Sequence, residues 1–129
     1  MRSQPMPQRE VLIVDDEASV RDVLAGILQD SGYKVDQAGT VAEAKQLLAT
    51  HRYRVVFADW RLPDGDGAAI ANLAAEIGSY AFVMSGYLRR MLPGNIDPRR
   101  TIMKPIKRDE LLATVRACIG TPTTDKGPP

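Results

Sequence analysis

The sequence predicts an α/β fold in which helices cover both faces of a parallel sheet of five strands. Short apolar runs alternate about five times with longer segments of helical periodicity, which is the pattern of a doubly wound parallel sheet. The clearest runs, VLIV and VVFA, are apolar at every position, as expected for strands buried on both faces. The length of 129 residues suits one domain with one core.

The predicted strands are short. They are expected at residues 10–14, 33–37, 54–58, 80–84 and 101–103. The first and third are the clearest, whereas the second is only a candidate. Right-handed crossovers would place the carboxyl end of every strand on the same edge of the sheet. Ligands bind at that edge in sheets of this kind, at the point where the strand order reverses.

Two helices are predicted in the first half of the chain. Apolar residues recur at helical spacing over residues 20–28, and Gly32 is expected to end that helix. Thr40 and Glu43 have the spacing of a capping box for the next helix, which runs through Leu48.

The second half predicts an alanine-rich helix ending at Gly78 and a closing amphipathic helix within residues 107–120. Another helix would be expected between the fourth and fifth strands. Because Pro93, Gly94 and Pro98 interrupt that segment, we expect only a short or irregular fourth helix there.

Composition narrows the class of protein. The net charge of +1 gives no basic excess for direct nucleic-acid binding. No apolar run approaches the roughly 18 residues of a membrane span, and no signal peptide is evident, so a cytoplasmic protein is expected. Cys118 is expected to be an inert buried thiol, with a redox sensor as the alternative. The expected organisation is a disordered tail at 1–8, a domain at 9–120, and a linker or free tail at 121–129.

Chemically distinctive residues follow four of the five strands. Asp15 and Asp16 follow the first strand, Asp59 the third, Ser85 the fourth and Lys104 the fifth. If the first and third strands are neighbours, the three acids crowd together, with a hydroxyl and an ammonium beside them. Each residue alone could be a helix cap, a turn residue or a solvated side chain, but their joint placement indicates a site.

This set of groups favours phosphoryl chemistry. Three carboxylates in one pocket repel one another, and a hard divalent cation such as Mg²⁺, which prefers oxygen ligands, relieves the repulsion. Asp59 could attack a phosphoryl group as a carboxylate nucleophile. Lys104 and the cation would offset the charge on the phosphoryl oxygens, and Ser85 could donate a hydrogen bond to one of them.

The motifs VDDE, VVFADWRLPDGDG, VMSG and MKP together resemble the receiver domain of bacterial two-component response regulators. The resemblance covers about residues 9–120. It implies a flavodoxin-like fold with strand order 2-1-3-4-5. It also implies a cytoplasmic signalling switch of a two-component system or phosphorelay, which takes its phosphoryl group from a sensor histidine kinase or a histidine phosphotransfer protein. A downstream protein target or a fused output domain would receive the signal, and a homodimer is one possible state.

The resemblance also implies the role of each site residue. Asp59 matches the phosphoacceptor, and it is also expected to be one of the metal ligands. Asp16 matches a direct ligand of Mg²⁺ (or Mn²⁺), Asp15 an acid that binds the metal through water, and Arg61 the position whose backbone carbonyl joins them. Ser85 matches the switch hydroxyl.

The lysine of the MKP motif completes the implied site. Lys104 matches the residue that pairs with the phosphoryl group, and the bond to Pro105 is expected to be cis.

Four residues depart from the family pattern or have side chains to which the resemblance assigns no role. Thr101 stands where the family usually has Phe or Tyr, and it cannot supply the same buried aromatic area, which puts the usual aromatic switch in question. Tyr87 is a candidate substitute, or a residue that shields the phosphoryl group from water. Trp60 and Arg61 are expected to control access to Asp59 or to contact a partner; the alternative is an exposed ring packed on the loop.

Two other functions remain as alternatives. One is a receiver-like interaction module that signals without phosphorylation, which Thr101 weakly favours. The other is an enzyme, but the chain has no GxxxxGK[ST] nucleotide loop, and Arg61 stands where an aspartate-based phosphatase has its second acid. The DGDG sequence also lacks the spacing of a calcium loop. No enzymatic activity is expected beyond the domain's own phosphoryl acceptance and dephosphorylation.

Overall fold

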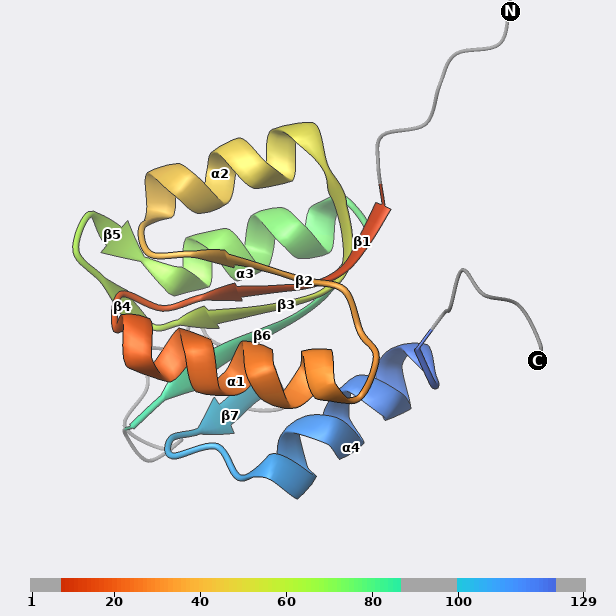
Figure 1. The fold of residues 1–129 in the computed structure, drawn as a ribbon. Helices are drawn as coiled ribbons and strands as arrows, with labels where there is room; N and C mark the ends of the chain where they lie inside the picture. The colour runs from red at the N-terminus through yellow and green to blue at the C-terminus, as the bar shows by residue number, and fades with distance from the viewer. Residues whose placement is uncertain (1–7, 87–99, 123–129) are drawn as a thin grey trace, which may run out of the picture.

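The computed structural model describes residues 8–86 and 100–122 (Figure 1). The elements of the first half are β1 (Gln8–Val14), α1 (Ala18–Asp30), β2 (Val35–Ala38), α2 (Val41–Thr50) and β3 (Arg52–Asp59). They are followed by β4 (Arg61–Leu62), β5 (Gly65–Asp66), α3 (Gly67–Glu76), β6 (Tyr80–Ser85), β7 (Thr101–Met103) and α4 (Arg108–Ile119).

The central sheet has five parallel strands in the order β2-β1-β3-β6-β7. Because β4 and β5 form a separate antiparallel pair, this is the predicted 2-1-3-4-5 order, and the prediction of a doubly wound parallel sheet is confirmed. In Figure 1, α2 and α3 cover one face of the sheet, and α1 and α4 cover the other.

The strand β1 explains why two helical layers form. Its residues 11–14 are fully buried, and their side chains point alternately to the two faces. Leu12 and Val14 belong to the core beneath α2 and α3, whereas Val11 and Ile13 belong to the core beneath α1 and α4. Each such side chain stabilises the fold by about 1.5–3 kcal/mol when it is buried.

Several local predictions agree with the structure. Gly32 and Gly78 follow α1 and α3 with φ of 100° and 101°, a conformation that favours glycine. Thr40 accepts a hydrogen bond from the Glu43 amide at 3.1 Å and so caps α2. The Glu43 carboxylate accepts from the Gly39 amide at 2.8 Å, one residue earlier than in a standard capping box.

The expected second strand begins later than its predicted start. Tyr33 is not part of β2; its ring is buried, and its hydroxyl donates to the carbonyl of Gly120 at 2.7 Å, beyond the end of α4. Cys118 on α4 is only partly buried, and burial raises the pKa of its thiol, which favours the unreactive protonated form.

Some predictions fall outside the described residues. The short or irregular fourth helix and Tyr87 lie in the segment 87–99, and most of the two expected tails lie in residues 1–7 and 123–129. Among the helices of the described ranges, none is long and apolar enough to cross a membrane.

Candidate functional site

The parallel sheet brings the predicted polar residues to one edge. Asp15 follows β1 directly, Asp59 and Ser85 end β3 and β6, and Lys104 follows β7. Asp59 lies opposite Met84 in the register of β3 and β6. The backbone amide of Lys104 donates to the Ser85 carbonyl at 2.7 Å, which joins the ends of β6 and β7.

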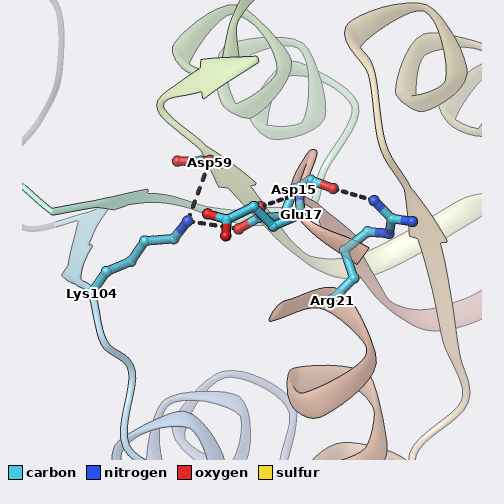
Figure 2. A network of polar contacts seen from close by, with 5 residues as sticks. All are labelled: Asp15, Glu17, Arg21, Asp59 and Lys104. Atoms are coloured by element: carbon cyan, nitrogen blue, oxygen red, sulfur yellow. Dashed lines mark hydrogen bonds and ion pairs between the residues drawn. The ribbon is translucent and has the colours of Figure 1, made fainter. Parts of the chain in front are cut away.

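The Lys104 ammonium lies between two of the acids (Figure 2). Its Nζ is 2.7 Å from Oδ2 of Asp15 and 3.3 Å from Oδ2 of Asp59. The Asp15 side chain is fully buried, whereas that of Asp59 is 14% exposed. The Lys104 ammonium therefore contacts the buried carboxylate of Asp15 and also lies beside the partly exposed carboxylate of Asp59.

Asp15 is fixed by groups on three sides. Its Oδ1 accepts from the Glu17 amide at 2.9 Å, and its Oδ2 accepts from Lys104. Its backbone carbonyl accepts from Nη1 of Arg21 at 2.5 Å, one turn into α1 (Figure 2). Both oxygens of this carboxylate are thus already engaged within the protein.

The acidic cluster includes a residue that the sequence analysis did not assign. Carboxylate oxygens of Asp15, Asp16 and Glu17 all lie within 4.8 Å of one another. Asp16 and Glu17 are both exposed residues. The signal for Glu17 was the third acid of the VDDE motif. Asp59 is not one of these three; its carboxylate is held beside Lys104 instead.

Asp59 and Lys104, whose charged groups are 3.3 Å apart, both have raised pKa values. Burial raises the pKa of Asp59, and the charges of Asp15 and Asp16 add to this rise, while Lys104 opposes it. Burial alone would lower the pKa of Lys104, but its hydrogen bond to Asp15 and the charges of Asp59 and Asp15 outweigh that effect and raise it. Lys104 therefore stays charged, and the site has an excess of negative charge around Asp59.

The loop after β3 approaches its own start very closely. The amide of Gly67 donates to the Trp60 carbonyl at 2.8 Å. A Cβ atom at Gly67 would lie 1.8 Å from the carbonyl oxygen of Asp59, far inside van der Waals contact. Only glycine fits at this position, so the start of α3 is packed directly against the backbone of Asp59.

The remaining predicted residues surround this centre. Trp60 is partly buried and packs against the core beneath α2 and α3, so it is not the exposed ring of the alternative reading. The guanidinium carbon of Arg61 is 5.1 Å from the centroid of the Trp60 ring, within the range of a cation–π contact. Ser85 and Thr101 are both buried. The Lys104–Pro105 peptide bond is cis, where the resemblance places it.

Comparison with known proteins identifies the class. Residues 11–116 match the sequence model of the response regulator receiver domain. The chain belongs to this family.

Two curated relatives are response regulators. Response regulator MprA of Mycobacterium sp. (strain KMS) is 30% identical over 128 residues, which cover 95% of this chain and 55% of MprA. Response regulator Rre1 of Synechocystis sp. is 33% identical over 114 residues, which cover 82% of this chain and 49% of Rre1. The chain thus spans about half the length of these relatives.

Solved structures of receiver domains have the same fold. A CheY-like receiver domain protein from Methanospirillum hungatei JF-1 aligns with a TM-score of 0.74 at 26% identity, covering 85% of this chain and 92% of that one. The receiver domain of NtrX from Brucella abortus aligns with a TM-score of 0.69 at 30% identity, covering 84% and 97% of the two chains.

Proposed function

We propose that this receiver domain is a signalling switch that accepts a phosphoryl group on Asp59 from a phosphohistidine of a sensor histidine kinase or a histidine phosphotransfer protein. The observation that carries this proposal is the position of the Lys104 ammonium, 3.3 Å from the Asp59 carboxylate and anchored on buried Asp15. A nucleophilic carboxylate and a fixed positive charge are thereby paired at the open edge of the sheet.

The acidic cluster fits a hard divalent cation, Mg²⁺ or Mn²⁺. Three carboxylate oxygens, one from each acid, lie within 4.8 Å of one another and match the oxygen ligands that Mg²⁺ prefers. Asp16 is exposed and would bind the ion directly, with the backbone carbonyl of Arg61. Since both oxygens of Asp15 already accept hydrogen bonds, Asp15 would act through a water molecule. Glu17 would be a further outer acid. When bound, the cation neutralises charge on the phosphoryl oxygens.

The reaction is a transfer from nitrogen to oxygen. A carboxylate oxygen of Asp59 forms a bond to phosphorus as the bond between phosphorus and the histidine nitrogen breaks, and the imidazole leaves with the electron pair. Lys104 offsets the negative charge of the transferred group, and the hydroxyl of Ser85 donates a hydrogen bond to it. The product is an acyl phosphate on Asp59.

The new charge is the signal. A phosphoryl group adds about −1.5 to −2 charges, which would bias the loops around Ser85 between two arrangements. Thr101 is buried at the position of the usual aromatic residue, so the signal would travel without an aromatic side chain there. The recipient would be a downstream protein or a fused output domain, with homodimer formation as one possible output.

Intact-mass measurement tests the proposal. The protein is incubated with Mg²⁺ and acetyl phosphate, and separately with a phosphorylated histidine phosphotransfer protein. We expect one phosphoryl adduct that is absent from Asp59→Asn. If the wild-type protein binds Mg²⁺ but gains no adduct from either donor, it is an interaction module that signals without phosphorylation. If it turns over a nucleotide steadily, it is an enzyme.

A further inference from the structure

The tip of the loop after β3, at Asp64, is hydrogen-bonded to the start of α2. The carboxylate of Asp64 accepts hydrogen bonds from two backbone amides in the first turn of α2, from Val41 at 2.7 Å and from Ala42 at 3.0 Å. Each bond uses a different oxygen. These two bonds hold the pKa of the Asp64 carboxyl below its usual value, so Asp64 is charged at neutral pH. A single side chain thus joins segments 22 and 23 residues apart in sequence.

Apolar contacts reinforce the same attachment. Leu62 is buried in the core beneath α2 and α3, against which Val41 also packs. A Cβ atom at Gly65 would lie 3.1 Å from Cγ2 of Val41, so the loop backbone and that side chain are in close contact. The tip therefore rests on α2 through both charged and apolar groups.

The base of the loop is equally constrained. Arg61 pairs with Asp66 across the two short strands β4 and β5, and the carboxylate of Asp66 caps α3 by accepting from Ala68 at 2.7 Å. Gly67 closes the loop against Asp59 and Trp60. The backbone of Arg61 is consequently held on two sides. At the base of the loop it is held by the β4–β5 pairing and the close approach of Gly67, and at the tip by the hydrogen bonds of Asp64 to α2.

We propose that Asp64 is a positioning residue for the metal site: by capping α2, it fixes the loop that presents the backbone carbonyl of Arg61 to the cation. This inference rests on the proposed function, because it assigns Arg61 to the metal. Asp64 itself touches neither the cation nor the phosphoryl group. It acts one step further out, through the loop backbone. The loss of a group that is hydrogen-bonded to a ligand commonly weakens metal binding by about 10- to 100-fold, so the lower end of that range is expected for Asp64.

The matched control is the other cap of the same helix. Thr40 also caps α2, through the Glu43 amide, and in the described structure its side-chain hydrogen bonds go to Glu43, whereas those of Asp64 reach α2 from the loop. Thr40→Ala and Asp64→Ala therefore both remove a cap from α2, and only Asp64→Ala releases the loop. Asp64→Asn keeps the shape of the side chain and an oxygen that can accept one of the two bonds.

The test is a Mg²⁺ titration of the full chain, followed by the fluorescence of Trp60, the single tryptophan and the neighbour of Asp59. We expect Asp64→Ala to raise the Kd for Mg²⁺ about tenfold. Asp64→Asn should give an intermediate value, and Thr40→Ala should stay close to wild type. Without metal, hydrogen exchange should become faster at the amides of Val41 and Ala42 in Asp64→Ala.

Each result has a distinct meaning. If Asp64→Ala, or Asp64→Asn where the alanine variant does not fold, binds Mg²⁺ as tightly as wild type, this inference is wrong and the proposed function stands. Equal weakening by Thr40→Ala also overturns it, because the effect would then come from α2 alone. If the wild-type protein does not bind Mg²⁺, the inference and the proposed metal site fail together.

Discussion

Replacing Gly67 by alanine should damage both the stability of the fold and the acceptor. The added Cβ would lie 1.8 Å from the carbonyl oxygen of Asp59 and 2.7 Å from its carbonyl carbon. Both are backbone atoms, so no side chain can turn away. The start of α3 and the end of β3 must separate by more than about 1 Å before the contact becomes tolerable.

The magnitude follows from two effects. Overpacking of this kind lowers the free energy of unfolding by about 1–3 kcal/mol. Stretching the bond from the Gly67 amide to the Trp60 carbonyl removes about 0.5–1.5 kcal/mol more. A loss of about 2–4 kcal/mol leaves most proteins of this size folded, because their total stability is about 5–15 kcal/mol. With a urea m-value of about 2 kcal/mol/M, in the middle of the usual range, the midpoint should fall by about 1–2 M.

The loss of stability is measured by urea unfolding followed by Trp60 fluorescence. The damage to the acceptor is measured as the initial rate of phosphoryl transfer from acetyl phosphate. That rate should fall by about 100-fold, because a nucleophile displaced by about 1 Å is no longer aligned. Gly26→Ala in α1 is the control, since its Cβ meets no atom within 4 Å and alanine favours a helix by about 0.5–1 kcal/mol. An unfolding midpoint of Gly67→Ala equal to that of Gly26→Ala would refute the steric reasoning.

Three further outcomes follow from the described contacts. Lys104→Met should lower the free energy of unfolding by about 3 kcal/mol in urea titrations, because it leaves the buried carboxylate of Asp15 without its cation. An unchanged midpoint would mean that water solvates this carboxylate as well as the Lys104 ammonium does. Asp59→Asn should raise the urea midpoint in metal-free buffer at pH 7, since the raised pKa of Asp59 means that its charged form destabilises the folded state. That advantage should vanish as the pH falls below about 4, the unfolded pKa, where the carboxyl is protonated in both states, and a gap that persists there would contradict the electrostatic explanation. Tyr33→Phe should lower stability by about 1 kcal/mol through the lost bond to Gly120. Because burial raises the pKa of Tyr33, the stability that this side chain contributes to the wild-type protein should be lost as the pH rises above about 10. The melting temperature of Tyr33→Phe should therefore fall less steeply than that of the wild type over this alkaline range.

The sequence predicted the sheet well because its strands carry a strong local signal. The runs that contain Val11 and Val55 are apolar at every position, and parallel topology then sends the residues after them to one edge. On that basis Asp15, Asp59 and Lys104 could be placed at one edge of the sheet. The strand order that brings them close together, and the role of each residue, came from the resemblance.

The features that were missed have no periodic signal. The strands β4 and β5 are two residues each, too short for alternation to register. The attachment of Asp64 to α2 was not predicted, because the two backbone amides that it binds lie more than 20 residues earlier in the chain and any residue type could carry them. Tyr33 was placed in the strand expected at residues 33–37, whereas its hydroxyl bonds to the carbonyl of Gly120 just beyond the end of α4.

The alternating side chains of β1 have a consequence for how the domain responds as a whole. This strand supplies Leu12 to one core and Ile13 to the other, and it lies in the sheet between β2 and β3. Neither helical layer can lose its packing without exposing a strand that the other layer needs. The two layers should therefore unfold as one cooperative unit, with hydrogen exchange in α2 and α4 reporting the same opening free energy. A change at the end of β1, where Asp15 lies, is thus connected to both faces of the molecule.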